Sequence, residues 1–415
     1  MPTPPPPTPA TPGRALILGD HRQSLVVARS LQHAGYEVTL GSSEAFSMLR
    51  HSRHVSATWR YPCPIAQPDR FDAALAGWVA ASPSPALLFP VGDLEVAALA
   101  AREAGLPPRA RVVMANREAV RLCHDKPALY EVARDAGLMV ADYEVAVASH
   151  VDLAVARIGY PCVVKPASSV EDGARFKALV LHGPPVPPLS AVLRGQDWLA
   201  IVQRKTAGVR HNCQFVAHRG VLLAYLEQSV QRTTRADGSG YGVQGRSEQP
   251  DEQRRRACER LLAALDYSGA GCVQFLVDPA HGESWLLEIN PRLDATCAVA
   301  AHCGYDLPRL AVHEALHRAG QGPLPQPLPA GYPAGRRAVW LTGDLRALLN
   351  ELQARRIAPK QAPGWLARSV VACLRADLHL TFSWRDPQPA LRALLELVGA
   401  PVWRRVRRLL PRRTG

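Results

Sequence analysis

Short apolar runs alternate with amphipathic segments in the first part of the chain. Apolar residues are contiguous in residues 14–20 and again in residues 86–93, and each run ends in glycine and aspartate. Residues 24–35 and 95–106 instead repeat apolar positions at helical spacing, and residues 36–40 predict a further strand. Because strands separated by helices pair in parallel, this alternation predicts an open parallel α/β sheet.

The pattern changes to longer strands further along the chain. Residues 198–228 contain three apolar stretches separated by Gly208 and Gly220, which predicts three strands joined by turns. Residues 270–292 predict a hairpin that turns at the sequence HGE. Between them, residues 228–250 are polar and rich in glycine, so we expect a loop there.

Polar groups stand at the end of an apolar strand in SWLLEINPRLDATC, residues 284–297. Buried charge is costly unless it is paired or bound to a cation, so Glu288 needs a partner. Glu288 and Asn290 are two residues apart and point to one face of an extended strand. Gln274, on the other arm of the hairpin, faces the same side if the register allows it. Such oxygens suit magnesium, whereas the simpler alternative is a solvated carboxylate before an Asn-Pro turn.

Lysine is rare in this chain, so the position of each lysine is informative. Three of the five lysines fall between residues 126 and 177. Lys126 precedes an amphipathic helix, Lys165 follows buried valines at a strand end, and Lys177 begins a returning strand. A lysine ammonium at such a position suits a phosphate, although each lysine alone also fits a solvated surface residue.

Composition and motifs exclude several classes of protein. A length of 415 residues predicts two or three domains, and 47% apolar with 20% charged residues is typical of a globular protein. No apolar run approaches the roughly 20 residues that span a bilayer, and the N-terminus has no secretory signal pattern. The nine cysteines are scattered without a CxxC pair, which argues against a disulfide framework or a zinc site. Neither GxGxxG nor a Walker A loop is present, which excludes a Rossmann nicotinamide site and a P-loop.

The net charge of +13 is unevenly spread along the chain. Residues 403–415 carry six arginines, in a pattern that fits a short basic amphipathic helix or a solvated tail. A membrane-surface or nucleic-acid binder acting through this tail therefore stays open as an alternative function. Residues 1–13 are rich in proline and are expected to be disordered.

The order of Lys126, VVKP with Lys165, the segment IVQ, and VQF followed by LLEINPR resembles the ATP-grasp superfamily. The resemblance is greatest to the carbamoyl phosphate synthetase large subunit and related carboxylate–amine ligases, and it covers residues 14–319. It implies an α/β fold with α+β lobes: an ATP-grasp fold preceded by an open parallel α/β domain and followed by a small α+β extension. The expected units are a disordered tail (1–13), the α/β domain (14–115), the ATP-grasp domain (116–321), the extension (322–402) and a basic tail (403–415).

The resemblance also implies roles for individual residues. One group would contact the phosphates of ATP: Lys126, Lys165 and Lys177. A second group, on the segment IVQ, would meet the adenine: Ile201, Val202 and Gln203. A third group would hold two Mg²⁺ ions, with Mn²⁺ as an alternative: Gln274, Glu288 and Asn290. Arg292 would meet the transferred phosphoryl group or its acceptor.

The reaction implied by the resemblance is ATP-dependent ligation in the cytoplasm. A small-molecule carboxylate attacks the γ-phosphate to give an acyl phosphate and ADP, and an amine or a thiol then displaces phosphate. Substrate recognition is expected in the polar segment 228–250, through Arg232, Arg235, Tyr241 and Arg246, although each of these residues alone also fits a flexible loop with solvated arginines. A nucleotide-binding scaffold with weak turnover and a homodimeric assembly stay open.

Three positions depart from the pattern of the superfamily. The loop after Lys165 has one glycine, Gly173, where relatives have more. Arg210 lies near the position of a ribose-binding acid, and Asp294 and Ala295 follow NPR where small residues are frequent. The first two departures bear on ATP binding, and the third bears on the choice of acceptor.

Overall fold

The computed structural model describes residues 13–82, 85–102, 106–107, 109–170 and 178–397. The basic tail predicted at 403–415, Lys177, Gly173 and all but the last residue of the predicted N-terminal tail lie outside these ranges.

Five parallel strands form the first sheet, in the spatial order β3-β2-β1-β4-β5. Its elements are β1 (Arg14–Leu18), α1 (Arg22–His33), β2 (Glu37–Ser42), η1 (Met48–His51), β3 (Ala57–Arg60), α2 (Pro68–Ala80), β4 (Ala86–Pro90), α3 (Asp93–Ala101) and β5 (Ala110–Val112). The sheet confirms the parallel α/β unit that the alternating pattern predicts. Because β1 pairs with β4, the segments after Leu18 and after Pro90 meet at one edge of this sheet.

Four strands form the smallest sheet, in the order β6-β9-β7-β8. Its elements are β6 (Tyr143–Val147), η3 (Ala148–His150), α6 (Val151–Ile158), β7 (Cys162–Pro166), β8 (Leu179–Leu181), α7 (Leu189–Val192) and β9 (Leu199–Arg204). One face carries Val164 and Val202 into a cluster with α6, as the alternation of side chains along a strand requires. Lys165 and Ile201, which are register partners, share the opposite face.

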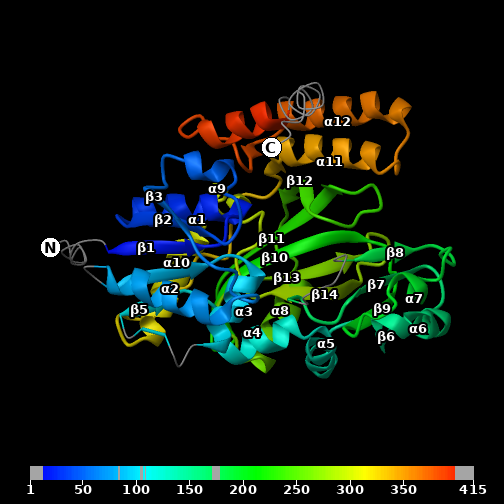
Figure 1. Ribbon diagram of the computed structural model, residues 1–415, viewed down its shortest axis with the longest axis horizontal. Helices are drawn as coiled ribbons and strands as arrows, with labels where there is room; N and C mark the ends of the chain where they lie inside the picture. The colour runs from blue at the N-terminus through cyan, green and yellow to red at the C-terminus, as the bar shows by residue number, and fades with distance from the viewer. Residues whose placement is uncertain (1–12, 83–84, 103–105, 108, 171–177, 398–415) are drawn as a thin grey trace, which may run out of the picture.

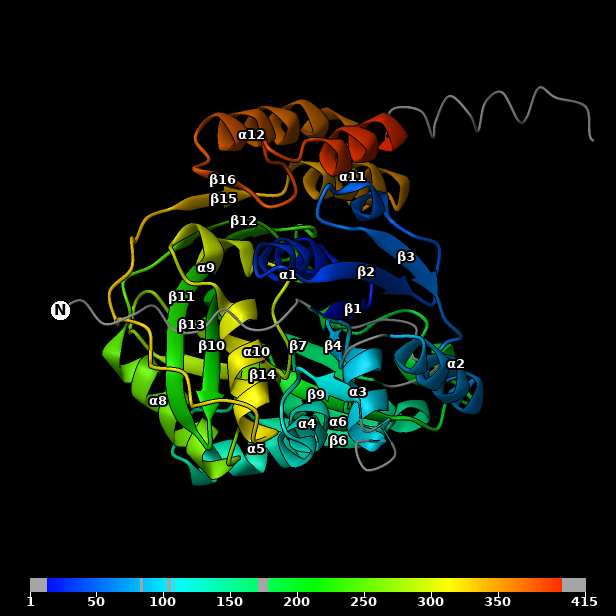
Figure 2. The same cartoon turned by 90° about the vertical axis from the view of Figure 1, so that its left-hand side faces the viewer.

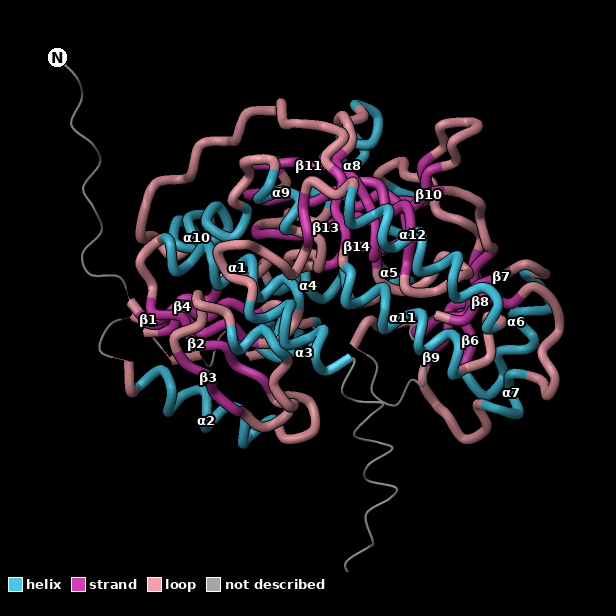
Figure 3. The backbone as a smooth tube through the Cα atoms, turned by 90° about the horizontal axis from the view of Figure 1, so that it is seen from above, coloured by secondary structure: helices cyan, strands magenta, loops and turns pink. Residues whose placement is uncertain are grey.

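Seven strands form the largest sheet, in the order β14-β13-β10-β11-β12-β15-β16, and it lies between the other two sheets (Figures 1 and 3). Its strands are β10 (Val209–His218), β11 (Val221–Thr233), β12 (Gly242–Ser247), β13 (Gly269–Val277), β14 (Ser284–Asn290), β15 (Arg337–Val339) and β16 (Leu378–His379). The expectation of a loop over residues 228–250 is wrong for most of that segment, because β11 and β12 pair there. A side chain at Gly245 would collide with the carbonyl oxygen of Ser229, so this glycine permits a close approach of two strands rather than a flexible loop.

Helices cover both faces of the largest sheet. They are α4 (Arg117–His124), α5 (Lys126–Asp135), α8 (Glu252–Ala264), α9 (Ala298–His302) and α10 (Leu307–Arg318). Two helices follow the NPR segment, and Gly304 adopts a φ of +90° between α9 and α10. Figure 2 shows α10 beside β10 and β11.

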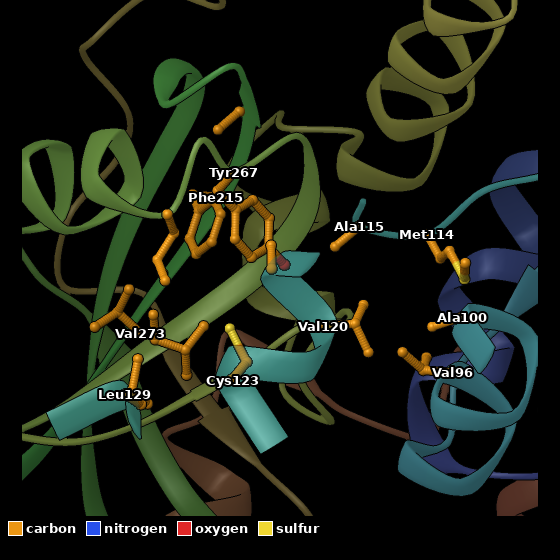
Figure 4. Packing of buried hydrophobic residues seen from close by; sticks show 14 of the residues in the cluster. Val96, Ala100, Met114, Ala115, Val120, Cys123, Leu129, Phe215, Tyr267 and Val273 are labelled. Carbon is orange, nitrogen blue, oxygen red and sulfur yellow. The ribbon is translucent and has the colours of Figure 1, made fainter. Parts of the chain in front are cut away.

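The core that joins the first sheet to the largest sheet is built around α4. Val120 and Cys123 of α4 lie between Val96 of α3 and Val273 of β13, and all four side chains are buried (Figure 4). Further along the same cluster, the rings of Phe215 and Tyr267 pack edge to face with centroids 5.1 Å apart. This continuous core fixes the edge of the first sheet against the end of β14.

The C-terminal extension is joined to the largest sheet rather than standing apart from it. It contains β15, α11 (Leu341–Gln353), η4 (Pro359–Gln361), α12 (Ala362–Leu374) and β16. Strand β15 pairs with β12, and the helices cover that end of the sheet (Figures 1 and 2). None of the helices in the described part of the chain has the length and apolar character needed to cross a bilayer.

Candidate functional site

The predicted oxygen ligands lie on one face of the β13–β14 hairpin. Gln274 stands directly opposite Glu288, and Asn290 follows Glu288 by two residues on the same strand. Asn212 of β10 stands opposite Gln274 on its other side and continues this polar face. The register that the metal hypothesis requires is therefore present. A carboxylate and two amides that share one face form a set of hard oxygen donors, which fits a magnesium ion.

Lys165 is a buried cation whose described partners are neutral. Its Nζ donates to the hydroxyl of Tyr130 at 2.7 Å and to Oε1 of Gln203 at 2.9 Å. Burial lowers the pKa of Lys165 to about 8, although the charge of Glu288 works in the opposite direction. Since no carboxylate within the described ranges forms an ion pair with it, this ammonium is suited to receive an anion.

The segment IVQ reaches the site through two of its three side chains. Gln203 contacts Lys165, and Ile201 lies on the same face of β9. Val202 faces the opposite way and packs with α6, so the structure does not bring its side chain to the site.

Lys126 lies at the first residue of α5, beside the segment that follows β7. Its Nζ donates to the hydroxyl of Ser169 at 2.9 Å, and Asp125 caps the helix by accepting from the backbone amide of Ala128. Tyr130 is four residues later on the same helix face, so α5 presents both Lys126 and the hydroxyl that contacts Lys165. The third predicted phosphate contact, Lys177, lies outside the described residues.

Arg292 connects the NPR segment to the first sheet. Its Nε and Nη2 donate to the two carboxylate oxygens of Asp93 at 2.6 and 2.8 Å, and Nη2 also lies 3.4 Å from Oδ1 of Asn290. Burial acts to lower the pKa of Arg292, but the charge and hydrogen bonds of Asp93 raise it above its ordinary value. Asp93 was not predicted from the sequence as a site residue. The one indication of it there is its position at the polar end of the apolar segment 86–93.

The Asp93–Arg292 pair leads to a stability prediction. Asp93→Asn removes the charge that compensates a largely buried guanidinium, since the side chains of Arg292 and Asp93 are 14% and 21% exposed. We expect the variant to lose roughly 3 kcal/mol of unfolding free energy. Asp72→Asn is the control, because its partner Arg102 holds it in a more exposed pair, and it should lose less than about 1 kcal/mol. Denaturant unfolding of both variants measures the difference, and equal losses would contradict the role of Asp93.

Comparison with known proteins identifies the fold. Residues 244–319 match the family described as the carbamoyl-phosphate synthase L chain, ATP binding domain. The carbamoyl phosphate synthase large chain of Thermus thermophilus is 24% identical over 302 residues, which are 68% of this chain and 28% of the relative. That of Gemmatimonas aurantiaca is 22% identical over 307 residues, 69% of this chain and 27% of the relative. The chain thus spans little more than a quarter of the length of these relatives.

Solved structures resemble the chain over most of its length. Biotin carboxylase from Campylobacter jejuni superposes with a TM-score of 0.58 at 16% identity, covering 79% of this chain and 75% of that one. L-amino acid ligase from Bacillus licheniformis gives 0.59 at 13% identity and covers 79% of each chain. N5-carboxyaminoimidazole synthetase from Staphylococcus aureus gives 0.56 at 14% identity, covering 82% and 86%.

The chain has the ATP-grasp fold. The fold predicted from the sequence is therefore confirmed. In this ATP-grasp chain the family match begins in β12 and extends through α10, so it includes the β13–β14 hairpin with its oxygen donors.

The residues proposed for substrate recognition are spread over separate contacts in the ATP-grasp fold. Arg232 forms an ion pair with the buried Asp344 of α11, and its guanidinium lies 5.5 Å from the ring of Trp365. Arg232 thus anchors the C-terminal extension. Arg246 pairs with Glu248 at 2.8 Å, and Arg235 pairs with Asp237 at 3.4 Å. The structure does not assemble these three arginines into one site, because each binds a different carboxylate.

Three other charged residues lie near the candidate site, where the charge of Asp294 acts on Arg22 and Arg210, and that of Glu288 acts on Arg210. Arg22, at the start of α1, lies 5.8 Å from the ring of Tyr241, the fourth residue predicted for recognition. Arg210 on β10 and Asp294 after the NPR segment complete the group. The sequence marked Arg210 and Asp294 only as departures from the superfamily pattern, and it gave no signal for Arg22.

Proposed function

We propose that the protein is an ATP-dependent ligase that joins a carboxylate to an amine through an acyl phosphate and releases ADP and phosphate. The observation that carries this proposal is the register of Gln274 opposite Glu288 on the β13–β14 hairpin of an ATP-grasp fold. It supports a site in which hard oxygen donors adjoin a buried lysine ammonium, and phosphoryl transfer requires that combination of charge neutralisation and positioning.

The donor set fits magnesium, which would be held by Gln274, Glu288 and Asn290. Bound there, the ion would neutralise charge on the phosphates of ATP. Lys165 and Lys126 are proposed to contact those phosphates, and Ile201 and Gln203 to line the adenine side. Arg292, oriented by Asp93, is proposed to meet the transferred phosphoryl group or its acceptor. Each of these assignments combines the role that the resemblance implies with the contacts described above.

The chemistry proceeds in two steps. A carboxylate oxygen forms a bond to the γ-phosphorus of ATP, and the bond from that phosphorus to the bridging oxygen breaks, so ADP leaves. The lone pair of an amine nitrogen then attacks the acyl carbon, the bond from carbon to the phosphate oxygen breaks, and the nitrogen loses a proton. A thiol that attacks the acyl carbon would likewise displace phosphate and lose a proton, and the product would be a thioester.

The test is a product analysis with pooled candidate carboxylates and amines. We expect ADP and inorganic phosphate to form only when ATP, Mg²⁺, a carboxylate and an amine are all present. Carboxylate labelled with ¹⁸O should transfer one label to the released phosphate, because the acyl phosphate passes that oxygen to phosphorus. Formation of AMP and pyrophosphate would contradict the acyl phosphate. Nucleotide binding without turnover would instead favour the scaffold function.

A further inference from the structure

Three charged side chains from distant parts of the sequence have no role in the proposed phosphoryl transfer. They are Arg22 at the start of α1, Arg210 on β10, and Asp294 between the NPR segment and α9. They carry two positive charges and one negative charge.

Arg22 is held in place by aromatic rings and a backbone carbonyl. Its guanidinium lies 3.8 Å from the ring centroid of Trp340 and 5.8 Å from that of Tyr241, and its Nη1 donates to the carbonyl of Gly242 at 3.1 Å. Within the described residues no carboxylate lies within ion-pair distance of it. Burial lowers the pKa of Arg22 to about 10, so it stays charged at neutral pH.

Arg210 is held by the same turn as Arg22. Its Nη1 donates to the carbonyl of Gly240 at 2.9 Å, two residues from the carbonyl that Arg22 contacts, and its buried Nε has no hydrogen-bond partner. No ion pair of Arg210 occurs in the part of the chain that the structure describes. Burial lowers its pKa, whereas the charges of Asp294 and Glu288 act in the opposite direction, which is consistent with a position beside the candidate metal ligands.

Two neighbouring guanidinium groups that form no ion pair among the described residues are costly to bury, because buried charges are ordinarily paired. Each guanidinium has five N–H donors and uses only one in a hydrogen bond to the described protein. The unused donors can bind a carboxylate through paired hydrogen bonds. The pair therefore has the properties of an anion subsite.

Asp294 has one oxygen anchored and one available. Its Oδ1 accepts from Nδ2 of Asn212 at 3.2 Å, from the backbone amide of Thr296 at 2.8 Å, and from the Thr296 hydroxyl. No hydrogen bond of the described residues ends on Oδ2. The anchored oxygen fixes the carboxylate, and the other oxygen can accept from a ligand.

We propose that Arg22, Arg210 and Asp294 bind the amine substrate as a zwitterion, so that the acceptor is an α-amino acid or a comparably compact amino-carboxylate. The substrate carboxylate is held by the two guanidinium groups, and its ammonium donates to Oδ2 of Asp294. A zwitterion matches this arrangement because its carboxylate meets the two positive groups and its ammonium meets the negative one, whereas an amine without a carboxylate leaves both guanidinium groups unpaired. This inference rests on the proposed ligase function and defines the class of its acceptor.

The test measures binding rather than turnover. The full chain is saturated with the β,γ-imido analogue of ATP and Mg²⁺, and its thermal unfolding is followed with arginine, histidine, lysine, tyrosine and serine. Each amino acid is compared with its decarboxylated amine: agmatine, histamine, cadaverine, tyramine and ethanolamine. We expect at least one amino acid to raise Tm, while its paired amine does not.

Variants locate the site. Arg22→Gln and Arg210→Gln should each weaken the binding of that amino acid on the order of 10-fold to 100-fold by calorimetry, while the affinity for the nucleotide analogue is retained. Asp294→Asn keeps Oδ1 and should weaken amino acid binding without affecting the nucleotide. Arg22→Lys keeps the positive charge but lacks the paired N–H donors of a guanidinium, so it should bind the amino acid better than Arg22→Gln but less well than the wild type. The control is Arg219→Gln, which removes an equal charge from the exposed β10–β11 turn and should bind as the wild type.

The outcomes separate this inference from the ligase proposal. If the nucleotide analogue binds but amino acids and decarboxylated amines give equal Tm shifts, or no amino acid binds, the acceptor class is wrong while the ligase proposal stands. Unchanged amino acid affinity in Arg22→Gln and Arg210→Gln would also overturn the site. A wild-type protein that binds neither nucleotide nor amino acid contradicts both proposals. Unfolding of each variant without ligand confirms that it is folded.

Discussion

Glu288→Gln is expected to abolish turnover and leave the fold intact. The substitution removes the only carboxylate from the proposed donor set of Gln274, Glu288 and Asn290, and a neutral amide holds a divalent cation weakly. We expect magnesium-dependent ADP formation to fall by roughly two to three orders of magnitude. Because the amide has nearly the same shape and Glu288 is only half-buried, the free energy of unfolding should change by less than about 1 kcal/mol.

A matched control for Glu288→Gln is available on the same hairpin. Glu283→Gln removes one exposed carboxylate next to the start of β14 and should keep wild-type activity. ADP formation at several magnesium concentrations, with a working substrate pair, measures both variants. Wild-type turnover in Glu288→Gln would show that the metal assignment is wrong.

Lys165→Met is expected to weaken nucleotide binding strongly. Methionine keeps much of the apolar stem of Lys165 but removes the ammonium, so the affinity for ATP should fall on the order of 10-fold to 100-fold. The stability of the ligand-free protein should barely change, since removing a desolvated charge offsets the lost hydrogen bonds to Tyr130 and Gln203. Lys360→Met removes an exposed lysine and is the control. If calorimetry gives equal ATP affinities for both variants, Lys165 does not contact the nucleotide.

The titration of Lys165 adds a pH dependence to the same prediction. Its pKa of about 8 in the folded protein lies below the ordinary value of 10.5, so the native state binds fewer protons than the unfolded state between these values. The Lys165 contribution to the stability of the ligand-free protein therefore rises with pH across that window. A bound phosphate favours the protonated ammonium, so ATP affinity should fall as pH rises above about 8. Lys165→Arg stays charged and should lose this pH dependence, whereas the same slope in the variant would contradict it.

The β13–β14 hairpin shows how far the sequence could be interpreted. The alternation of apolar and polar positions placed Glu288 and Asn290 on one face, and the turn at HGE placed Gln274 on the opposing strand. Both inferences depend on local geometry, because side chains alternate along a strand and a tight turn fixes the register. Lys165 was found for a similar reason, since a charged residue directly after buried valines needs a partner.

The expected acceptor residues show where such reasoning fails. Arg232 lies in a polar, glycine-rich segment that suggests a binding loop, yet in the structure it pairs with Asp344 of α11, more than a hundred positions along the chain. Composition indicates that a segment is polar but not which carboxylate its arginines meet. The same limit hid Asp93, whose partner Arg292 follows a strand of a different sheet.

The sequence by itself determined most of the elements of the first sheet and the face of the β13–β14 hairpin that carries the oxygen donors, because these follow from local periodicity and turn residues. It also predicted the parallel sheet of the first unit, and its motifs resemble those of the ATP-grasp superfamily. Only the tertiary structure decided which distant side chains compensate one another. It paired Arg292 with Asp93, joined the C-terminal extension to the largest sheet through β12 and β15, and brought Arg22 and Arg210 to one turn near Asp294. Charge compensation depends on distance in space, and this distance cannot be inferred from how far apart the groups lie in the sequence.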